Sequence, residues 1–355
     1  MRLMHVTWCV PVVAALIALS CNSRPIAHPE ATAARLDEEH DEEFYKKVAK
    51  TAGNQEWVLG ILVLGAPPEA CTYRHLGLEP GGPVLQKHLL PKGFDQNVQI
   101  ECAAVAKDGL AYATCGDALE FVKNGAITRL YTAPDWVVGM SFSPDSKTLF
   151  FIVNGDEKNR FRRQRLMVAD MATGNVRKLM VMDLRCVFKD LSMGRGRALV
   201  WLDNEHVVLD RADGQLVSID INTGDVKPLC KGRWPVSFRD GKLFAIRYDD
   251  EGEDAELISH DMASSKEERV LTIRGARGVG CPGMSPDGEW LILNANVLTH
   301  GRKEPQPHMY VIEIRSGKSC RLWTRYEFTP AGRPPVSFLA EGIFLTWETK
   351  SGPGR

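Results

Sequence analysis

Ser141-Phe142-Ser143-Pro144-Asp145-Ser146-Lys147-Thr148-Leu149-Phe150-Phe151 is a short apolar run, a turn and a second apolar run. Proline fixes φ and aspartate tolerates the left-handed region, so Pro144 and Asp145 set a tight turn that places two strands side by side. A second close copy of this pattern is Met284-Ser285-Pro286-Asp287-Gly288-Glu289-Trp290-Leu291. Each copy therefore predicts one hairpin, and their likeness predicts a repeat.

Weaker copies of this hairpin recur along the chain, with turns at Asp108, Asp203, Asp240 and Glu341. From Asp108 to Glu341 the five steps average about 47 residues, which is within the range of four-stranded propeller blades. A second marker alternates with the first, and it consists of a strand, a Thr-Gly-type turn and a strand that ends in leucine. Its copies are residues 166–179, 216–229, 256–271 and 309–322.

A four-stranded unit of this size cannot bury its own apolar faces, whereas units stacked radially around an axis cover one another and leave only short edges exposed. The chain is therefore predicted to be all-β. The hairpins at residues 143–145 and 285–287 resemble the repeats of TolB-like and WD-repeat-like β-propellers, and similar repeats occur in the propeller domains of prolyl oligopeptidase relatives. The resemblance covers roughly residues 57–348 and implies the fold. It leaves the function open, because propellers host many unrelated activities.

We expect a β-propeller domain at residues 57–349, followed by a tail at residues 350–355. The number of blades depends on how the ring closes. The expectation is six four-stranded blades, or seven if residues 57–64 belong to a blade of their own. In the six-bladed ring the closing blade takes two strands from each end of the domain, at residues 335–338, 343–349, 72–78 and 84–90.

The first residues of the chain predict export. Arg2 gives a positive start and residues 10–19 form an apolar run that is too short to span a bilayer, so residues 1–20 are predicted to be a signal peptide. Ala18-Leu19-Ser20-Cys21 resembles a bacterial lipobox, which implies that Cys21 is acylated and anchors the mature protein, with plain secretion as the alternative. Residues 21–56 are then expected to be a lipidated tether that contains one short helix.

The location follows from this anchor. In a Gram-negative cell, Asn22 after the cysteine resembles the pattern for delivery to the outer membrane, facing the periplasm. The formal net charge is −1, so the chain lacks the basic surface that neutralising a nucleic-acid backbone requires. The expected partners are a membrane, through the anchor, and a protein or an envelope polymer. Nucleic acid is excluded.

Motifs for catalysis and metal binding are missing from the sequence. It contains no Gly-x-Ser-x-Gly elbow, no His-Glu-x-x-His and no Cys-x-x-Cys. We therefore predict no catalytic residue, no metal ligand and no cofactor, although ligands gathered from several blades would leave no spacing signal. The histidines of the predicted propeller are spread singly, at His75, His88, His206, His260, His300 and His308.

The repeat carboxylates are predicted to cap turns rather than to catalyse, because a side-chain oxygen in such a turn can accept backbone N–H groups. These structural turn residues are Asp108, Pro144, Asp145, Asp240, Pro286 and Asp287.

Cysteine positions suggest one disulfide. Cys102 and Cys115 lie symmetrically about Asp108-Gly109, and counting outward from a two-residue turn places them opposite each other at a non-hydrogen-bonded position, where strands approach closely. Export permits oxidation, so a cross-strand disulfide is predicted. No pairing is assigned to Cys71, Cys186, Cys230, Cys281 and Cys320.

The leading functional hypothesis is a membrane-anchored, extracytoplasmic β-propeller that binds a protein or an envelope polymer and is a non-catalytic scaffold. The alternative is a propeller lyase or hydrolase that acts on a glycan or peptide at the central channel. A purely structural envelope protein, with no saturable ligand, is a third possibility.

Overall fold

The computed structural model describes residues 32–36, 57–63, 72–79, 82–89, 100–106, 109–114, 118–123, 126–132, 137–154, 163–184, 199–248, 254–276, 278–285, 287–297, 306–324 and 343–349. These residues form strands and turns, and no helix occurs among them. Within this part of the chain there is accordingly no helix with the length and apolar content needed to cross a bilayer. The predicted signal peptide, Cys21, the short helix, Asp108, Cys115 and Pro286 lie outside the described residues.

Most of the described strands form sheets of four consecutive antiparallel strands. The first contains β5 (Ile100–Ala106), β6 (Gly109–Thr114), β7 (Ala118–Lys123) and β8 (Ala126–Thr132), and the second β9 (Val137–Phe142), β10 (Thr148–Val153), β11 (Arg163–Asp170) and β12 (Val176–Asp183). The third contains β13 (Val200–Trp201), β14 (His206–Asp210), β15 (Gln215–Asp220) and β16 (Val226–Lys231). The fourth contains β17 (Trp234–Arg239), β18 (Lys242–Tyr248), β19 (Ala255–Asp261) and β20 (Glu267–Arg274), and the fifth β21 (Val279–Met284), β22 (Trp290–Val297), β23 (Gln306–Glu313) and β24 (Ser319–Thr324).

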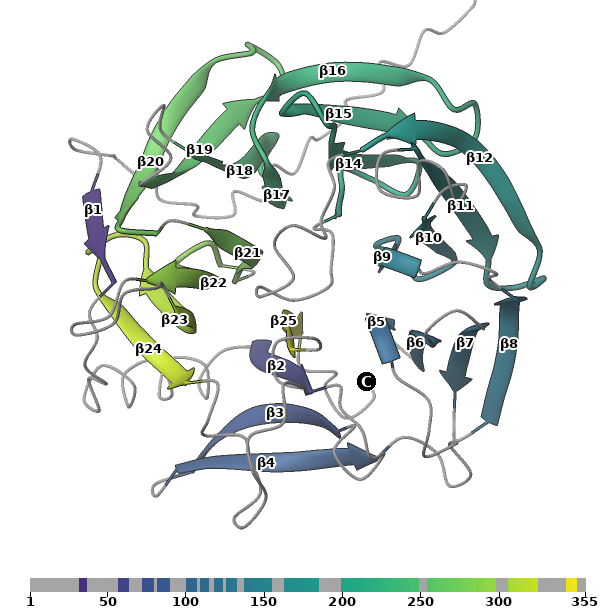
Figure 1. Ribbon diagram of the computed structural model, residues 1–355, viewed down its shortest axis with the longest axis horizontal. Helices are drawn as coiled ribbons and strands as arrows, with labels where there is room; N and C mark the ends of the chain where they lie inside the picture. Colours follow the sequence, from purple (N-terminus) through teal and green to yellow (C-terminus); the bar gives the residue numbers. More distant parts are fainter. Residues whose placement is uncertain are drawn as a thin grey trace, which may run out of the picture. The chain divides into compact units, whose positions relative to one another are not determined.

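The sheets follow one another around a centre (Figure 1), with the first strand of each sheet on the inside and the last on the outside. Hydrophobic clusters join each sheet to the next, so that β5–β8 packs on β9–β12, then β13–β16, β17–β20 and β21–β24 in chain order. For example, the rings of Phe150 on β10 and Trp201 on β13 meet edge to face with centroids 6.4 Å apart. This is the arrangement of a β-propeller, and the prediction of an all-β propeller is confirmed.

A sixth sheet combines the two ends of the domain. β25 (Ile343–Thr349) pairs with β2 (Trp57–Val63), and β3 (Thr72–Glu79) and β4 (Gly82–Leu89) follow. β2 therefore shares a sheet with these strands and has no separate sheet of its own. We expected each end of the domain to contribute two strands to the closing sheet. Among its described strands, three come from the N-terminal side and one from the C-terminal side. Residues 335–338, which were expected to form the other C-terminal strand, lie outside the described residues.

The second sequence marker has the same geometry in four sheets. Each turn is closed by a backbone bond from a residue with positive φ to the carbonyl four residues earlier. The pairs are Gly174 to Asp170, Gly224 to Asp220, Ser265 to Asp261 and Gly317 to Glu313, with N···O distances of 2.8 to 2.9 Å. Positive φ costs glycine little, which explains why three of the four positions hold it.

In β12 and β24 the leucine that ends this marker lies at a β-bulge. In β12 the register passes from Met167–Lys178 to Leu166–Met180, and this leaves Leu179 without an opposite residue. The register skips Leu322 in β24 and Leu130 in β8 in the same way. The bulge recurs in the outer strands of these sheets and is therefore part of the repeated unit. It increases the local twist of the strand.

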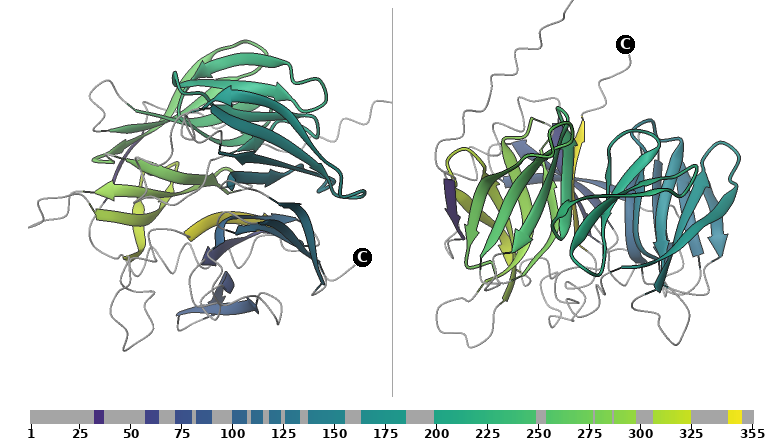
Figure 2. Two further views of the ribbon diagram at one scale, coloured as in Figure 1. Left: turned by 45° about the vertical axis from the view of Figure 1, so that its right-hand side comes forward. Right: turned by 90° about the horizontal axis from the view of Figure 1, so that it is seen from above.

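The segment predicted to be a tether contains a strand. β1 (Thr32–Arg35) pairs in parallel with β20 and becomes the fifth strand of that sheet. Its Ala34 is fully buried, and the carbonyl of Arg35 accepts a hydrogen bond of 2.6 Å from Ser319 Oγ on β24. Figures 1 and 2 show β1 between β20 and β24. The folded part of the chain therefore begins before the expected boundary at residue 57.

The contact between β1 and Gly317 gives a test of this docking. A Cβ on Gly317 would lie 2.6 Å from the carbonyl oxygen of Ala33, whereas a Cβ on Gly174 would meet nothing within 4 Å. The two glycines have φ of 69° and 71°, so replacement by alanine costs about 1 kcal/mol of backbone strain at either position. We expect Gly317→Ala, and not Gly174→Ala, to accelerate tryptic cleavage after Arg35 several-fold, as measured by mass spectrometry. Equal cleavage in both variants would contradict the docking of β1.

Candidate binding site

The turn residues singled out from the sequence bond mainly within their own hairpins. Asp145 accepts hydrogen bonds from Ser143 Oγ (2.7 Å) and from the backbone N–H of Lys147 (3.1 Å). These bonds hold the pKa of the Asp145 carboxyl below its ordinary value. Asp287 repeats the pattern with Ser285 Oγ (2.5 Å) and the N–H of Glu289 (3.0 Å). Pro144 is exposed beside Asp145, and Asp240 instead supports its turn with a φ of 50°.

A second set of capping carboxylates was missed in the sequence. Asp170, Asp220 and Asp261 each accept two backbone N–H groups from residues two and three positions later, at 2.7 to 3.1 Å. These hydrogen bonds lower the pKa of all three carboxyls. The signal was an aspartate four residues before the turn glycine or serine. The described repeat carboxylates therefore serve the turns.

The hairpin that carries Cys102 has a different register from the expected one. Ala106 pairs with Gly109 and Cys102 with Ala113, because the hairpin closes one residue earlier than the counting assumed. Cys102 is buried, and its Sγ donates to the carbonyl of Val137 at 3.2 Å. Cys115 lies outside the described residues, so the disulfide stays a prediction.

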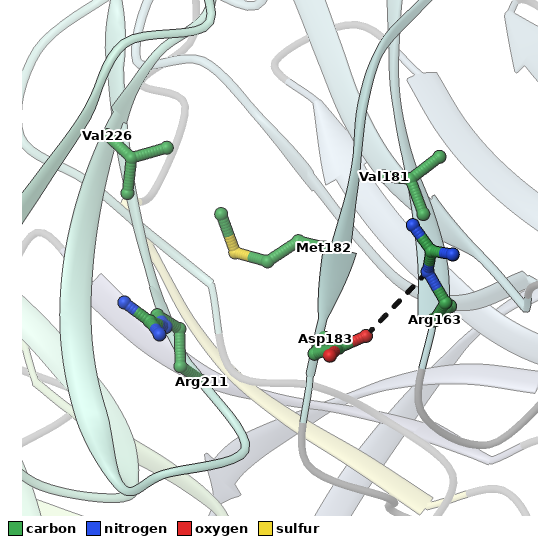
Figure 3. Close-up of a pocket in the computed structure, with 6 residues that line it drawn as sticks. All are labelled: Arg163, Val181, Met182, Asp183, Arg211 and Val226. Atoms are coloured by element: carbon green, nitrogen blue, oxygen red, sulfur yellow. Dashed lines mark ion pairs between the residues drawn. The ribbon is translucent and has the colours of Figure 1, made fainter.

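A shallow hollow of about 540 Å³ surrounds the end of β12, where the second and third sheets meet. Side chains from both faces of β12 line it, because successive residues of a strand point to opposite faces. Arg163, Val181 and Asp183 lie on one side of the strand, and Met182 extends from the other side towards Arg211 and Val226 (Figure 3).

The lining is apolar in its middle and charged around it. Val181 and Val226 are 41% and 36% exposed, and they are two of the three large hydrophobic side chains that are exposed among the described residues. Arg163 Nε lies 4.0 Å from Asp183 Oδ1, and an Arg211 guanidinium nitrogen lies 3.1 Å from Asp213 Oδ2. All four charged side chains are well exposed, so both arginines can exchange these partners for a ligand at little cost.

The backbone at this hollow belongs to an edge strand. Within the described residues β12 pairs with β11 alone, apart from one bridge in which Leu184, just after β12, meets Arg211. The N–H of Ala212 also donates to the carbonyl of Asp183 at 3.3 Å. These bonds fix the end of β12 against the third sheet. The preceding residues of β12 form the outer edge of the second sheet.

Comparison with known proteins gives likenesses to solved structures. Neither a family model nor a curated protein matches the chain. The chain is similar to TolB from Acinetobacter baumannii, with 11% identity, a TM-score of 0.46 and coverage of 84% of both chains. It is also similar to an oligogalacturonate lyase in complex with manganese, with 16% identity, a TM-score of 0.47 and coverage of 72% of this chain and 71% of that one. It is similar as well to the C-terminal WD40 domain of Sif2, with 11% identity, a TM-score of 0.44 and coverage of 76% of this chain and 80% of that one. The fold itself rests on the sheets and clusters described above.

The capping aspartates predict the response to acid. Their pKa values lie below the ordinary value of 3.8 in the folded chain, so they add stability that is complete above the unfolded pKa and is lost as the pH falls through the folded one. We expect the free energy of unfolding of the wild type to fall below about pH 5, and the variant Asp170→Asn/Asp220→Asn/Asp261→Asn to show a shallower fall in urea titrations.

The control for this prediction is Asp225→Asn, which removes an exposed carboxyl next to the Gly224 turn. It should leave the acid dependence close to that of the wild type. A triple variant with the full wild-type dependence would show that the three caps are not responsible.

Proposed function

We propose that the protein is a membrane-anchored, extracytoplasmic, six-bladed β-propeller that binds a partner protein without catalysis, and that the edge of β12 is its binding site. The observation that carries the proposal is the hollow at this edge, which places an exposed valine and an arginine on each of its two sides, with Met182 between them. Exposed apolar side chains that gather at one place and are bordered by charge are typical of interaction sites.

The form of the hollow supports recognition of an extended segment. A strand added to a sheet edge makes main-chain hydrogen bonds and presents its side chains alternately to the two faces. At β12 one face offers Val181 beside Arg163, and the other offers Met182 and Val226 beside Arg211. A partner segment with alternating apolar and acidic side chains would meet both faces.

The chain itself contains an example of this kind of contact. β1 adds to the outer edge of β20 and buries Ala34 completely. An outer edge of this ring therefore accepts an additional strand. The corresponding edge of β12 is occupied by no strand among the described residues.

The anchor is proposed from the sequence, in which Cys21 follows a short apolar run. Several acyl chains hold a protein at a membrane without a spanning segment. Ten residues separate Cys21 from Thr32, the first residue of β1. They can reach at most about 40 Å when fully extended. An acylated Cys21 would thus keep the β1 edge of the propeller close to the membrane surface.

The site can be tested with a photoreactive amino acid placed at Val181 in the exported protein in its own cells. We expect a defined crosslinked protein at this position, and we expect Arg211→Glu to reduce the adduct several-fold, because it reverses the charge beside the apolar surface. The matched control is Ile127, which is also 41% exposed and lies on the outer strand β8. In the same cells Cys21→Ala should move the protein from the membrane to the soluble fraction.

Adducts of equal yield at Val181 and Ile127, or an adduct that Arg211→Glu leaves unchanged, would show that the β12 edge is not the binding site. A Cys21→Ala protein that stays with the membrane would contradict the anchor and would leave the binding site to be judged on the crosslinks alone.

A further inference from the structure

The repeated framework allows residues of different sheets to be compared at equivalent positions. In four sheets the residue before the one whose carbonyl closes the repeated turn pairs across the hairpin with the first residue of the outer strand. In three sheets these pairs are Ala169–Val176, Ile219–Val226 and Ile312–Ser319, and the first member is apolar and completely buried. In the fourth sheet the pair is His260–Glu267.

The strand that faces this pair departs from the framework as well. Cys230 on β16 follows the bulge of the outer strand, where the register steps from Val217–Pro228 to Gln215–Lys231. At the corresponding place β12 has Met180 and β24 has Trp323, both of which follow the skipped leucine. A thiol and an imidazole thus replace apolar side chains, and a carboxylate replaces valine or serine, at one junction between sheets. Such local departures from a repeated pattern are expected at functional sites.

The three side chains lie together. One ligand atom each from Cys230, His260 and Glu267 falls within 4.8 Å of the other two. Cys230 and His260 are buried, at 4% and 5% exposure, whereas the Glu267 side chain is 36% exposed and opens the cluster to solvent. The nearest apolar neighbours belong to the cluster that joins the third and fourth sheets, including Leu216 and Ile258.

A buried polar atom in this cluster lacks a partner. His260 Nδ1 is inaccessible to solvent and makes no hydrogen bond, and Glu267 Oε1 lies 3.9 Å away. Leaving a buried ring nitrogen unsatisfied destabilises the folded chain, because the nitrogen loses its hydrogen bonds to water without gaining others. An unsatisfied ring nitrogen beside a carboxylate, on a residue that also clusters with a thiol, is able to act as a ligand for something that enters the cluster.

The carboxylate of Glu267 is already oriented. The Arg247 guanidinium binds Glu267 Oε2 at 3.2 Å and Glu256 Oε2 at 2.9 Å, and Arg269 binds Glu256 Oε1 at 3.2 Å. The ion pair with Arg247 engages Oε2 of Glu267, and Oε1 lies towards His260 Nδ1. Outer partners that orient ligands in this way are a regular feature of metal sites.

We propose that Cys230, His260 and Glu267 form a binding site for a divalent cation of the zinc type between the third and fourth sheets. Sulfur, imidazole nitrogen and carboxylate oxygen are the zinc ligands of proteins, and three of them leave the fourth tetrahedral position for water. Binding forms the Zn–S bond and releases the Cys230 thiol proton to solvent. The cation joins β16 to the β19–β20 hairpin and stabilises the contact between neighbouring sheets. The site does not depend on the partner proposed for β12.

A thiol nucleophile activated by His260 and Glu267 is the competing chemistry. A reactive thiol needs access to substrate and a lowered pKa. Burial, together with the negative charge of Glu267, raises the pKa of Cys230 to about 12, and the side chain is enclosed by the apolar cluster. A dication deprotonates a coordinating thiol despite such surroundings, so metal binding fits this thiol better than catalysis does.

The test uses the full-length chain, purified in detergent and stripped with a chelator, with Co²⁺ as a spectroscopic probe. We expect one Co²⁺ per chain, visible d–d bands of tetrahedral intensity and a near-ultraviolet thiolate-to-cobalt charge-transfer band, all displaced by Zn²⁺. Cys230→Ser should abolish the charge-transfer band. His260→Gln and Glu267→Gln should each weaken binding at least roughly 10-fold.

The matched control is Cys320→Ser, since Cys320 is buried as deeply on β24 but lies outside the cluster. It should keep the cobalt spectrum, and Zn²⁺ should raise its Tm as it raises that of the wild type. Zn²⁺ should not raise the Tm of Cys230→Ser, whose melting transition also shows whether that variant folds. Binding without a charge-transfer band, no binding, or equal loss of binding in both cysteine variants would overturn the site.

Discussion

The structure depends on the fact that a sheet of four short strands has two apolar faces and too little chain to cover either. Each face is covered by the next sheet. The hydrophobic clusters that cover the faces contain side chains from two neighbouring sheets, such as Phe150 with Trp201 and Leu216 with Leu243. The closing sheet, in which β25 pairs with β2, follows from the same need, because an open end would expose a face. The turns, bulges and caps serve to place each sheet where the next one can meet it.

A framework in which four sheets repeat the same turn makes its exceptions informative. Most positions that face a neighbouring sheet carry side chains that only need to pack. The junction with Cys230 and His260 and the edge with Val181 and Arg211 depart from that pattern in opposite ways, one by burying polar atoms and the other by exposing apolar ones. Both departures cost stability unless something binds there. They therefore form the basis of the two proposed sites.

The sequence predicts the fold because its turn chemistry is local. Pro144 and Asp145 determine a hairpin within a few residues, and the spacing of such hairpins is visible in one dimension. The β1 strand escaped prediction because its partner β20 is more than 200 residues away, and nothing in Thr32–Arg35 itself marks it as a sheet edge. The predicted register at Cys102 was wrong. The hairpin closes one residue earlier than assumed, so Cys102 pairs with Ala113, and the sequence spacing alone does not say at which residue a hairpin turns.

The two candidate sites could not be predicted from the sequence. Cys230, His260 and Glu267 come from strands of two sheets, and each was an isolated residue in the sequence. The exposure of Val181 and Val226 depends on how the end of β12 lies beside the beginning of β16. Binding sites of this kind arise from the packing of the sheets and leave no spacing that a motif could describe.

The mutual cover of neighbouring sheets is tested most directly by a double-mutant cycle across one junction, with Phe150→Leu and Trp201→Leu made singly and together. Their rings belong to different sheets and meet at 88° with centroids 6.4 Å apart. We predict that urea unfolding gives a coupling free energy of about 0.5–1.5 kcal/mol between the two positions. Single-variant effects that add to within about 0.3 kcal/mol would contradict the mutual cover of neighbouring sheets.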